Sequence, residues 1–174
     1  MTTTLLTNIK TFSDQQELVY TNIGVIDGKI AFIGKEPPEG FVADEVLDGN
    51  SFAALPGYID LHTHGALGHE MIGISAEGLQ EVTQFYASHG VTGFLATPWT
   101  APREEISKAI EVAKEVMGHE KGAKILGIHL EGPFLNVAVC GAQDKALIRT
   151  ADHEEAMEYL NSGLVKLIAL APEF

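Results

Sequence analysis

The sequence predicts an α/β protein, with about four β/α units of a (β/α)8 TIM-type barrel preceded by a small β-sandwich-like segment. Three observations support this fold class. Residues 1–53 contain short apolar runs joined by turns and no helical pattern. Residues 54–174 alternate strand and helix patterns, which indicates parallel β/α units. Polar residues also gather just after the predicted strands, which is where barrel proteins carry their functional sites.

An open doubly wound sheet is the alternative way to close such units. No Gly-x-Gly-x-x-Gly follows the first strand of the β/α region, which argues against a dinucleotide-binding fold. Because a barrel needs eight strands and we count about four, we expect this chain to be the front half of a longer protein.

The first segment is expected to be a small all-β unit over residues 1–53. We predict its strands at 17–20, 22–26, 29–33 and 41–47. Asp27-Gly28 separates the second and third of these runs, and that dipeptide strongly indicates a two-residue hairpin.

The second segment, residues 54–174, is expected to hold the β/α units. The predicted strands are 54–64, 91–97, 124–129 and 164–171. The predicted helices are 75–88, 100–117 and 152–160, where apolar residues recur at helical spacing. Ser75 and Asp152 are suited to cap the first and third helices, and Gly90, Gly118 and Gly163 are suited to end the three helices in turn.

The composition limits the choice of partners. Acidic residues outnumber basic ones 24 to 11, giving a formal net charge of −13, which argues against binding to nucleic acid or an anionic membrane surface. A single cysteine, Cys140, excludes an internal disulfide framework and fits a reducing compartment. No signal peptide or apolar stretch of membrane-spanning length is visible, so a cytoplasmic location is expected.

The candidate functional residues begin with His62 and His64. They end the first strand of the β/α region, and residues two apart on a strand face the same side. Two converging imidazoles make half of a metal site; the plainer interpretation is one buried and one surface histidine. Glu131 lies at the end of the third strand, two residues after His129 and before Gly132-Pro133.

If the first and third strands carry these side chains to one site, the donor set suits a divalent ion such as zinc or iron. Such an ion would polarise a carbonyl group and lower the pKa of a bound water to about 7.

Two stretches resemble a known family. Leu55 to Gly65 is similar to the Pro-Gly-…-Asp-x-His-x-His-Gly signature of the amidohydrolase superfamily. The block from His129 to Phe134, His-Leu-Glu-Gly-Pro-Phe, is narrower and resembles the N-acetylglucosamine-6-phosphate deacetylases. Gly141-Ala142 and the Leu-Ala-Pro-Glu at 170–173 match that family in the same order, so the resemblance covers the whole chain but about half of a family member.

The resemblance implies hydrolysis of the acetamide of N-acetylglucosamine 6-phosphate, an amino-sugar phosphate, to glucosamine 6-phosphate and acetate. It implies that Glu131, His62 and His64 bind one or two divalent ions, and that Ala142, Gly141 and Gln143 contact the sugar. It also implies a homo-oligomer, a dimer, for full-length members. The catalytic aspartate and two further metal-binding histidines would lie beyond Phe174, so we expect the isolated 174 residues to be inactive even with added zinc.

Two departures from the family pattern affect the substrate. Position 143 is often histidine and is Gln143 here, and residues 137–140 lack the usual basic side chains. The open alternatives are another amidohydrolase, such as a dihydroorotase or hydantoinase relative, and a non-catalytic piece that assembles with a partner. Lys166 on the fourth strand is expected to be an ordinary lysine rather than a carboxylated metal bridge. For His69, in the glycine-rich loop after the first strand, a role on the substrate side is the less favoured alternative.

Overall fold

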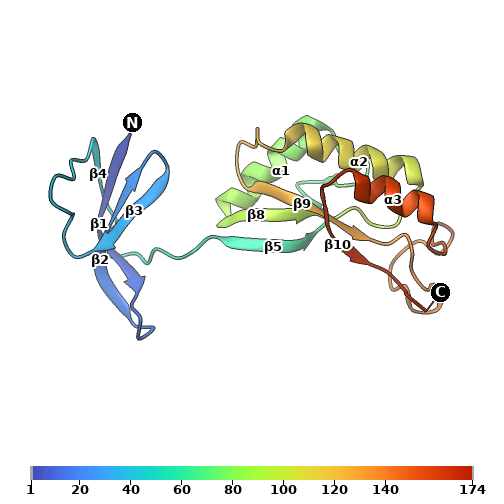
Figure 1. The fold of residues 1–174 in the computed structure, drawn as a ribbon, viewed down its shortest axis with the longest axis horizontal. Helices are drawn as coiled ribbons and strands as arrows, with labels where there is room; N and C mark the ends of the chain where they lie inside the picture. Colours follow the sequence, from blue (N-terminus) through green and yellow to red (C-terminus); the bar gives the residue numbers. More distant parts are fainter. Residues whose placement is uncertain (1, 174) are drawn as a thin grey trace. The chain divides into compact units, whose positions relative to one another are not determined.

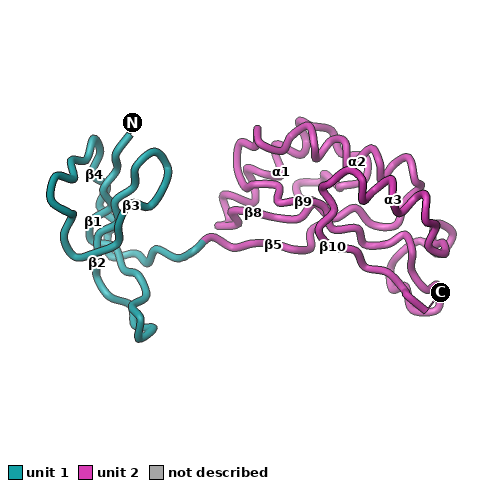
Figure 2. The backbone as a smooth tube through the Cα atoms, in the orientation of Figure 1, with its two compact units in different colours: residues 1–56 teal, residues 57–174 magenta. Residues whose placement is uncertain are grey.

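The computed structural model describes residues 2–173, which divide into two compact units. Unit 1 is Met1–Pro56 and unit 2 is Gly57–Phe174 (Figure 2). Each unit has its own sheet, and each is described by itself below.

Unit 1 is built on one four-stranded sheet in the order β3-β2-β1-β4. Its strands are β1 (Thr3–Phe12), β2 (Leu18–Ile26), β3 (Lys29–Gly34) and β4 (Glu45–Asp48). β2 pairs antiparallel with both β1 and β3, whereas β4 pairs parallel with β1. The described residues of this unit thus form one sheet, with Ile9 and Ile23 among its buried side chains.

The predicted hairpin in unit 1 is confirmed. Ile26 pairs with Lys29, and Asp27 and Gly28 both have positive φ, at 48° and 75°. Two consecutive positive φ angles are what a type I′ turn requires. The strand predictions were less accurate, because 17–20 and 22–26 form the single strand β2 and β1 was not predicted at all. Polar residues interrupt β1, and Asn8, with φ of 51°, lies where its pairing shifts register.

Unit 2 carries the predicted parallel sheet, in the order β10-β9-β8-β5. Its strands are β5 (Tyr58–Thr63), β8 (Val91–Ala96), β9 (Lys124–Glu131) and β10 (Val165–Ala169). They alternate with α1 (Ala76–Ser88), α2 (Arg103–Val116) and α3 (His153–Asn161), and every neighbouring pair of strands in this sheet is parallel. Two short additions are the hairpin of β6 (Gly65–Ala66) and β7 (His69–Glu70), and the 3-10 turn η1 (Val137–Val139).

The helix ends follow from the capping residues. Ser75 Oγ accepts a hydrogen bond from the Gly78 amide at 3.1 Å, and Asp152 Oδ1 accepts one from the Glu155 amide at 2.9 Å. These side chains satisfy amides that a helix cannot pair internally. α2 begins three residues later than predicted, after Pro102, which makes no side-chain cap. Apart from the later start of α2, the predicted order of strands and helices in unit 2 is confirmed.

The helices of unit 2 all lie on one face of its sheet (Figure 1). The core lies between them and includes Leu79 on α1, Phe94 on β8, Ile106 on α2, Ile128 on β9 and Tyr159 on α3, all at most 1% exposed. Several large apolar side chains of the sheet are not covered. Ile59, Leu61, Leu126 and Leu167 are 39% to 61% exposed.

Within the described part of the chain, none of the helices has the length and apolar character that crossing a bilayer requires.

Candidate functional site

The site lies at the carboxyl ends of the strands of unit 2. His62 is on β5, His64 follows that strand directly, and Glu131 is the last residue of β9. His64 Nε2 is 3.2 Å from Glu131 Oε2, and His62 Nε2 is 3.9 Å from Glu131 Oε1. One ligand atom from each of the three residues can be chosen so that all lie within 4.8 Å of one another. The structure therefore brings together the two stretches that the sequence singled out.

The orientation of His64 is fixed by its second ring nitrogen. His64 Nδ1 lies 2.9 Å from the backbone oxygen of Thr97, which can only accept, so Nδ1 carries the proton. In the neutral ring the lone pair is then on Nε2, which faces a carboxylate oxygen of Glu131. Two acceptors this close are stabilised only by a proton or a cation between them. This is the arrangement in which a second hydrogen bond orients a metal-binding histidine.

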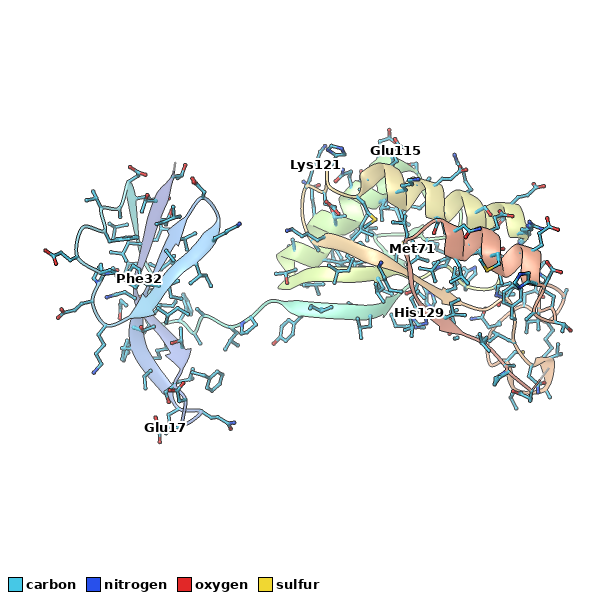
Figure 3. All side chains as sticks on the ribbon, in the orientation of Figure 1. Glu17, Phe32, Met71, Glu115, Lys121 and His129 are labelled. Atoms are coloured by element: carbon cyan, nitrogen blue, oxygen red, sulfur yellow. The ribbon has the colours of Figure 1, made fainter. Side chains whose placement is uncertain are left out.

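His129 packs against His62 and is not one of the three clustered donors. Its ring is 6% exposed, and Nδ1 donates to the backbone oxygen of Leu61 at 2.9 Å. The ring centroid lies 5.0 Å from that of His62, in an edge-to-face contact. His129 is labelled on β9 in Figure 3. It links β9 to β5 across the strand that separates them and limits where the His62 ring can lie.

Thr97 joins the ends of β5 and β8. Its side chain is fully buried, and its Oγ1 accepts from the Thr63 amide at 3.0 Å while donating to Leu95 O at 3.1 Å. Thr63 is in turn hydrogen-bonded to the Tyr86 hydroxyl of α1. Burial raises the pKa of Tyr86, so this phenol stays protonated. The segment that carries both histidines is thus held from two sides.

A pocket of about 590 Å³ opens beside the cluster. His64 and Glu131 line it together with Gly141, Ala142 and Gln143, the residues that the family resemblance assigned to substrate. The Gln143 side chain does not project freely, because its Oε1 accepts from the Thr100 amide at 2.9 Å.

Sequence reasoning missed part of the pocket, because Thr100, Asp144 and Leu147 also line it. Trp99 lies just past the second predicted strand, a position that suits either a core residue or a pocket wall. The structure places it in the pocket wall, with its ring centroid 5.3 Å from that of His64. Nothing local marked Asp144 or Leu147, which lie in an irregular segment.

Two other candidates lie outside the cluster. His69 Nε2 is 3.0 Å from Glu81 Oε2 on α1, so its environment is a helix surface and not the pocket. The Lys166 amine donates to Gly163 O at 3.3 Å near the start of β10, as expected for an ordinary lysine.

The donor set fits a divalent cation. Two imidazole nitrogens and one carboxylate are ligands that zinc and iron accept, and the spacing of the donors allows all three to reach one ion.

The comparisons identify the family. Residues 53–174 match the amidohydrolase family. The chain belongs to the amidohydrolase family. Members are generally metal-dependent, which agrees with the cluster of donors.

Within this family the chain is similar to N-acetylglucosamine-6-phosphate deacetylases. The enzyme of that name from Bacillus subtilis is 34% identical over 97% of this chain and 44% of its own length. The one from Vibrio furnissii is 37% identical over 68% of this chain and 31% of its own. The resemblance predicted from the block at 129–134 is therefore confirmed.

Solved structures agree. The deacetylase from Pasteurella multocida superposes with a TM-score of 0.84 at 25% identity, over 97% of this chain and 44% of its own. A variant of the Mycobacterium smegmatis enzyme, in complex with N-acetyl-D-glucosamine-6-phosphate, superposes with a TM-score of 0.81 at 27% identity, over 99% of this chain and 44% of its own. The chain thus spans less than half the length of these relatives and represents part of the fold.

Proposed function

We propose that this chain supplies part of the active site of a metal-dependent amide hydrolase that acts on N-acetylglucosamine 6-phosphate. In the proposal His62, His64 and Glu131 hold the ion, and the β/α units belong to a barrel. The observation that carries it is the convergence of these three side chains beside a pocket lined by Gly141, Ala142 and Gln143. The similarity to deacetylases over 97% of the chain supports the choice of substrate.

The chemistry of the site follows from its residues. A divalent ion in this position would polarise the amide carbonyl and acidify a water molecule. Glu131 would balance the charge of such an ion, and the hydrogen bond to the Thr97 carbonyl keeps the His64 Nε2 lone pair facing the Glu131 carboxylate. Trp99 offers an indole wall close to His64, and amide groups of the Gly141–Gln143 segment are suited to hydrogen-bond sugar hydroxyls.

The metal site can be tested by titrating the chain with Co²⁺. Trp99 is the only tryptophan, and its ring is close to His64, so quenching of its fluorescence reports binding at the cluster. Visible Co²⁺ absorption reports the ligand set. Because loss of even an outer-shell partner costs about 10- to 100-fold in metal affinity, Glu131→Gln and His64→Asn should weaken binding by about 100-fold or more.

The chain offers a matched control for this titration. His69→Asn and Glu81→Gln remove another histidine–glutamate pair, at 3.0 Å, on the surface of the same unit. These variants should bind Co²⁺ as the parent does. Unchanged affinity in Glu131→Gln, or an equal loss in the His69 and Glu81 variants, would contradict the proposed site.

The finer points are also proposals. We infer zinc or iron as the ion and one or two ions per site, from the nitrogen and oxygen donors. We infer a cytoplasmic enzyme from the single free cysteine, and a homodimer from the family resemblance. The proton-shuttling aspartate is proposed to lie outside these 174 residues, so the chain alone with zinc should not deacetylate the sugar phosphate.

Two alternatives remain to be separated from the deacetylase. A D-hydantoinase structure superposes with a TM-score of 0.53 at 27% identity, over 74% of this chain, so cyclic amides belong in the substrate panel. The exposed Ile59, Leu61, Leu126 and Leu167 favour a piece that assembles through its sheet, which the mass in solution would reveal.

A further inference from the structure

Arg149 connects several walls of the pocket without lining it. Its Nη1 donates to Leu147 O at 2.8 Å and to Ala101 O at 3.1 Å. Leu147 lines the pocket, and Ala101 directly follows Trp99 and Thr100, which also line it. The Arg149 amide donates to Pro133 O at 3.2 Å, in the turn after Glu131. Arg149 therefore joins its own near neighbour Leu147 to two segments that are remote in sequence, and all of them meet at the site.

Two buried residues of α3 orient the guanidinium. Arg149 Nε donates to Glu155 Oε2 at 2.9 Å, and Nη2 donates to Glu155 Oε1. Glu155 is 5% exposed and also accepts from the hydroxyl of Tyr159, which is 1% exposed. This bidentate pairing fixes the plane of the guanidinium.

The ionisation of Glu155 and Arg149 agrees with their pairing. Burial by itself would raise the pKa of Glu155, but hydrogen bonds from Arg149 and Tyr159 hold that pKa below its usual value. The hydrogen bond to Glu155 raises the pKa of Arg149. The carboxylate and the guanidinium thus both stay charged near neutral pH.

The hydrogen bonds of Arg149 leave little capacity for a ligand. A guanidinium has five N–H groups, and here Nε, both N–H groups of Nη1 and one of Nη2 face protein acceptors. A role in holding substrate phosphate directly is therefore disfavoured.

We propose that Arg149 is a positioning residue: it ties the wall that contains Gly141–Leu147 to the turn that contains Trp99–Ala101, with Glu155 and Tyr159 fixing its orientation. The inference rests on the proposed function in that the walls so held are those that bind substrate. The hydrogen bond between Gln143 and the Thr100 amide crosses between the same two segments. Loss of the Arg149 side chain should loosen this wall while His62, His64 and Glu131 keep their own partners.

Cys140 provides a direct readout of the wall. It is the only cysteine, it lines the pocket directly before Gly141, and its thiol donates to Val137 O at 3.4 Å. Cys140 is partly buried, so its rate of reaction with Ellman's reagent reports the accessibility of the thiol, which should rise when the wall loosens. Arg149→Lys and Arg149→Ala should react about tenfold faster than the parent chain, and millimolar methylguanidinium should restore slow labelling to Arg149→Ala alone.

Arg103 supplies the matched control. It also binds α3, donating from Nε to Glu158 Oε2 at 2.7 Å, but its side chain is 41% exposed and its hydrogen bonds go to Glu154 and Glu158 of that helix. Arg103→Lys should label as the parent does. Circular dichroism shows whether Arg149→Ala folds. If it does not, the labelling rates of Arg149→Lys and Tyr159→Phe test the proposal instead, because each of these variants removes a single feature of the network.

A ligand titration separates this inference from the proposed function. With zinc present, N-acetylglucosamine 6-phosphate binding is followed by Trp99 fluorescence. Arg149→Lys should weaken sugar binding about tenfold and change zinc affinity less than twofold. If the parent chain binds no sugar, the proposed contact of the Gly141–Gln143 segment with the sugar phosphate is contradicted, while the labelling rates still test the role of Arg149. Folded Arg149 variants that label at the parent's rate, or lose zinc and sugar affinity equally, would overturn the inference.

Discussion

Replacing Arg149 by methionine would leave the Glu155 carboxylate buried without a cation. Glu155 is 5% exposed, and its remaining side-chain donor is the hydroxyl of Tyr159. Removing one partner of a buried ion pair typically costs about 3 to 5 kcal/mol, because the other charge stays desolvated. With a shift of about 4 °C per kcal/mol for a unit of this size, the melting temperature of unit 2 should fall by about 12 to 20 °C.

A double-mutant cycle tests this reasoning more sharply than the single change. In Arg149→Met combined with Glu155→Met, no uncompensated charge remains, and apolar replacement of both partners of a buried pair is often close to neutral. We therefore expect the double variant to be more stable than Arg149→Met alone, by about 2 kcal/mol or more. Urea unfolding followed by Trp99 fluorescence reports this, since Trp99 belongs to unit 2. Equal stability of the single and double variants would refute the claim that a stranded carboxylate dominates the cost.

Two further changes have defined outcomes. The pKa of Glu155 is lowered in the folded state, so the ionised carboxylate stabilises the fold. This stabilisation is complete above the ordinary glutamate pKa of about 4.3 and is lost as the pH falls from there through the lower pKa of the folded state. The stability advantage of the parent over Glu155→Gln, measured by urea unfolding, should therefore be constant from pH 7 to 5 and decrease below pH 5. Gly122→Ala places a Cβ 2.2 Å from the backbone oxygen of Thr83 on α1 and should cost about 1 to 3 kcal/mol in urea unfolding. An unchanged stability of Gly122→Ala would show that α1 shifts at little cost.

The parts of the structure that the sequence predicts well are those with local causes. Ser75 and Asp152 cap their helices, and Asp27-Gly28 forms its hairpin, because each depends on a few neighbouring residues. The convergence of His62 and His64 with Glu131 was also predictable, since carboxyl ends of parallel strands meet at one edge of a sheet.

Features that depend on long-range packing were not predicted. β1 was missed because Asn8 and Lys10 break its apolar pattern, although its partner strands β2 and β4 complete it. The ion pair of Arg149 with Glu155 and its bond to Ala101 bring together residues whose sequence carries no periodic signal. The partner of His69 was not predicted either, because Glu81 on α1, which lies 3.0 Å from its ring, is twelve residues away in the sequence.

The place of β8 between β5 and β9 sets the width of the candidate metal centre. β8 contributes none of the three donors, yet it separates the strands that do by two inter-strand steps, about 9.6 Å between backbones. Hydrogen bonding fixes that separation, so it cannot be adjusted to suit a particular ion. The reach of the side chains is the remaining variable, and shortening Glu131 to aspartate would open the gap by one methylene group. The sheet thus fixes the separation of the strands that carry the donors, and selection among ions of different radius depends on the length of the donor side chains.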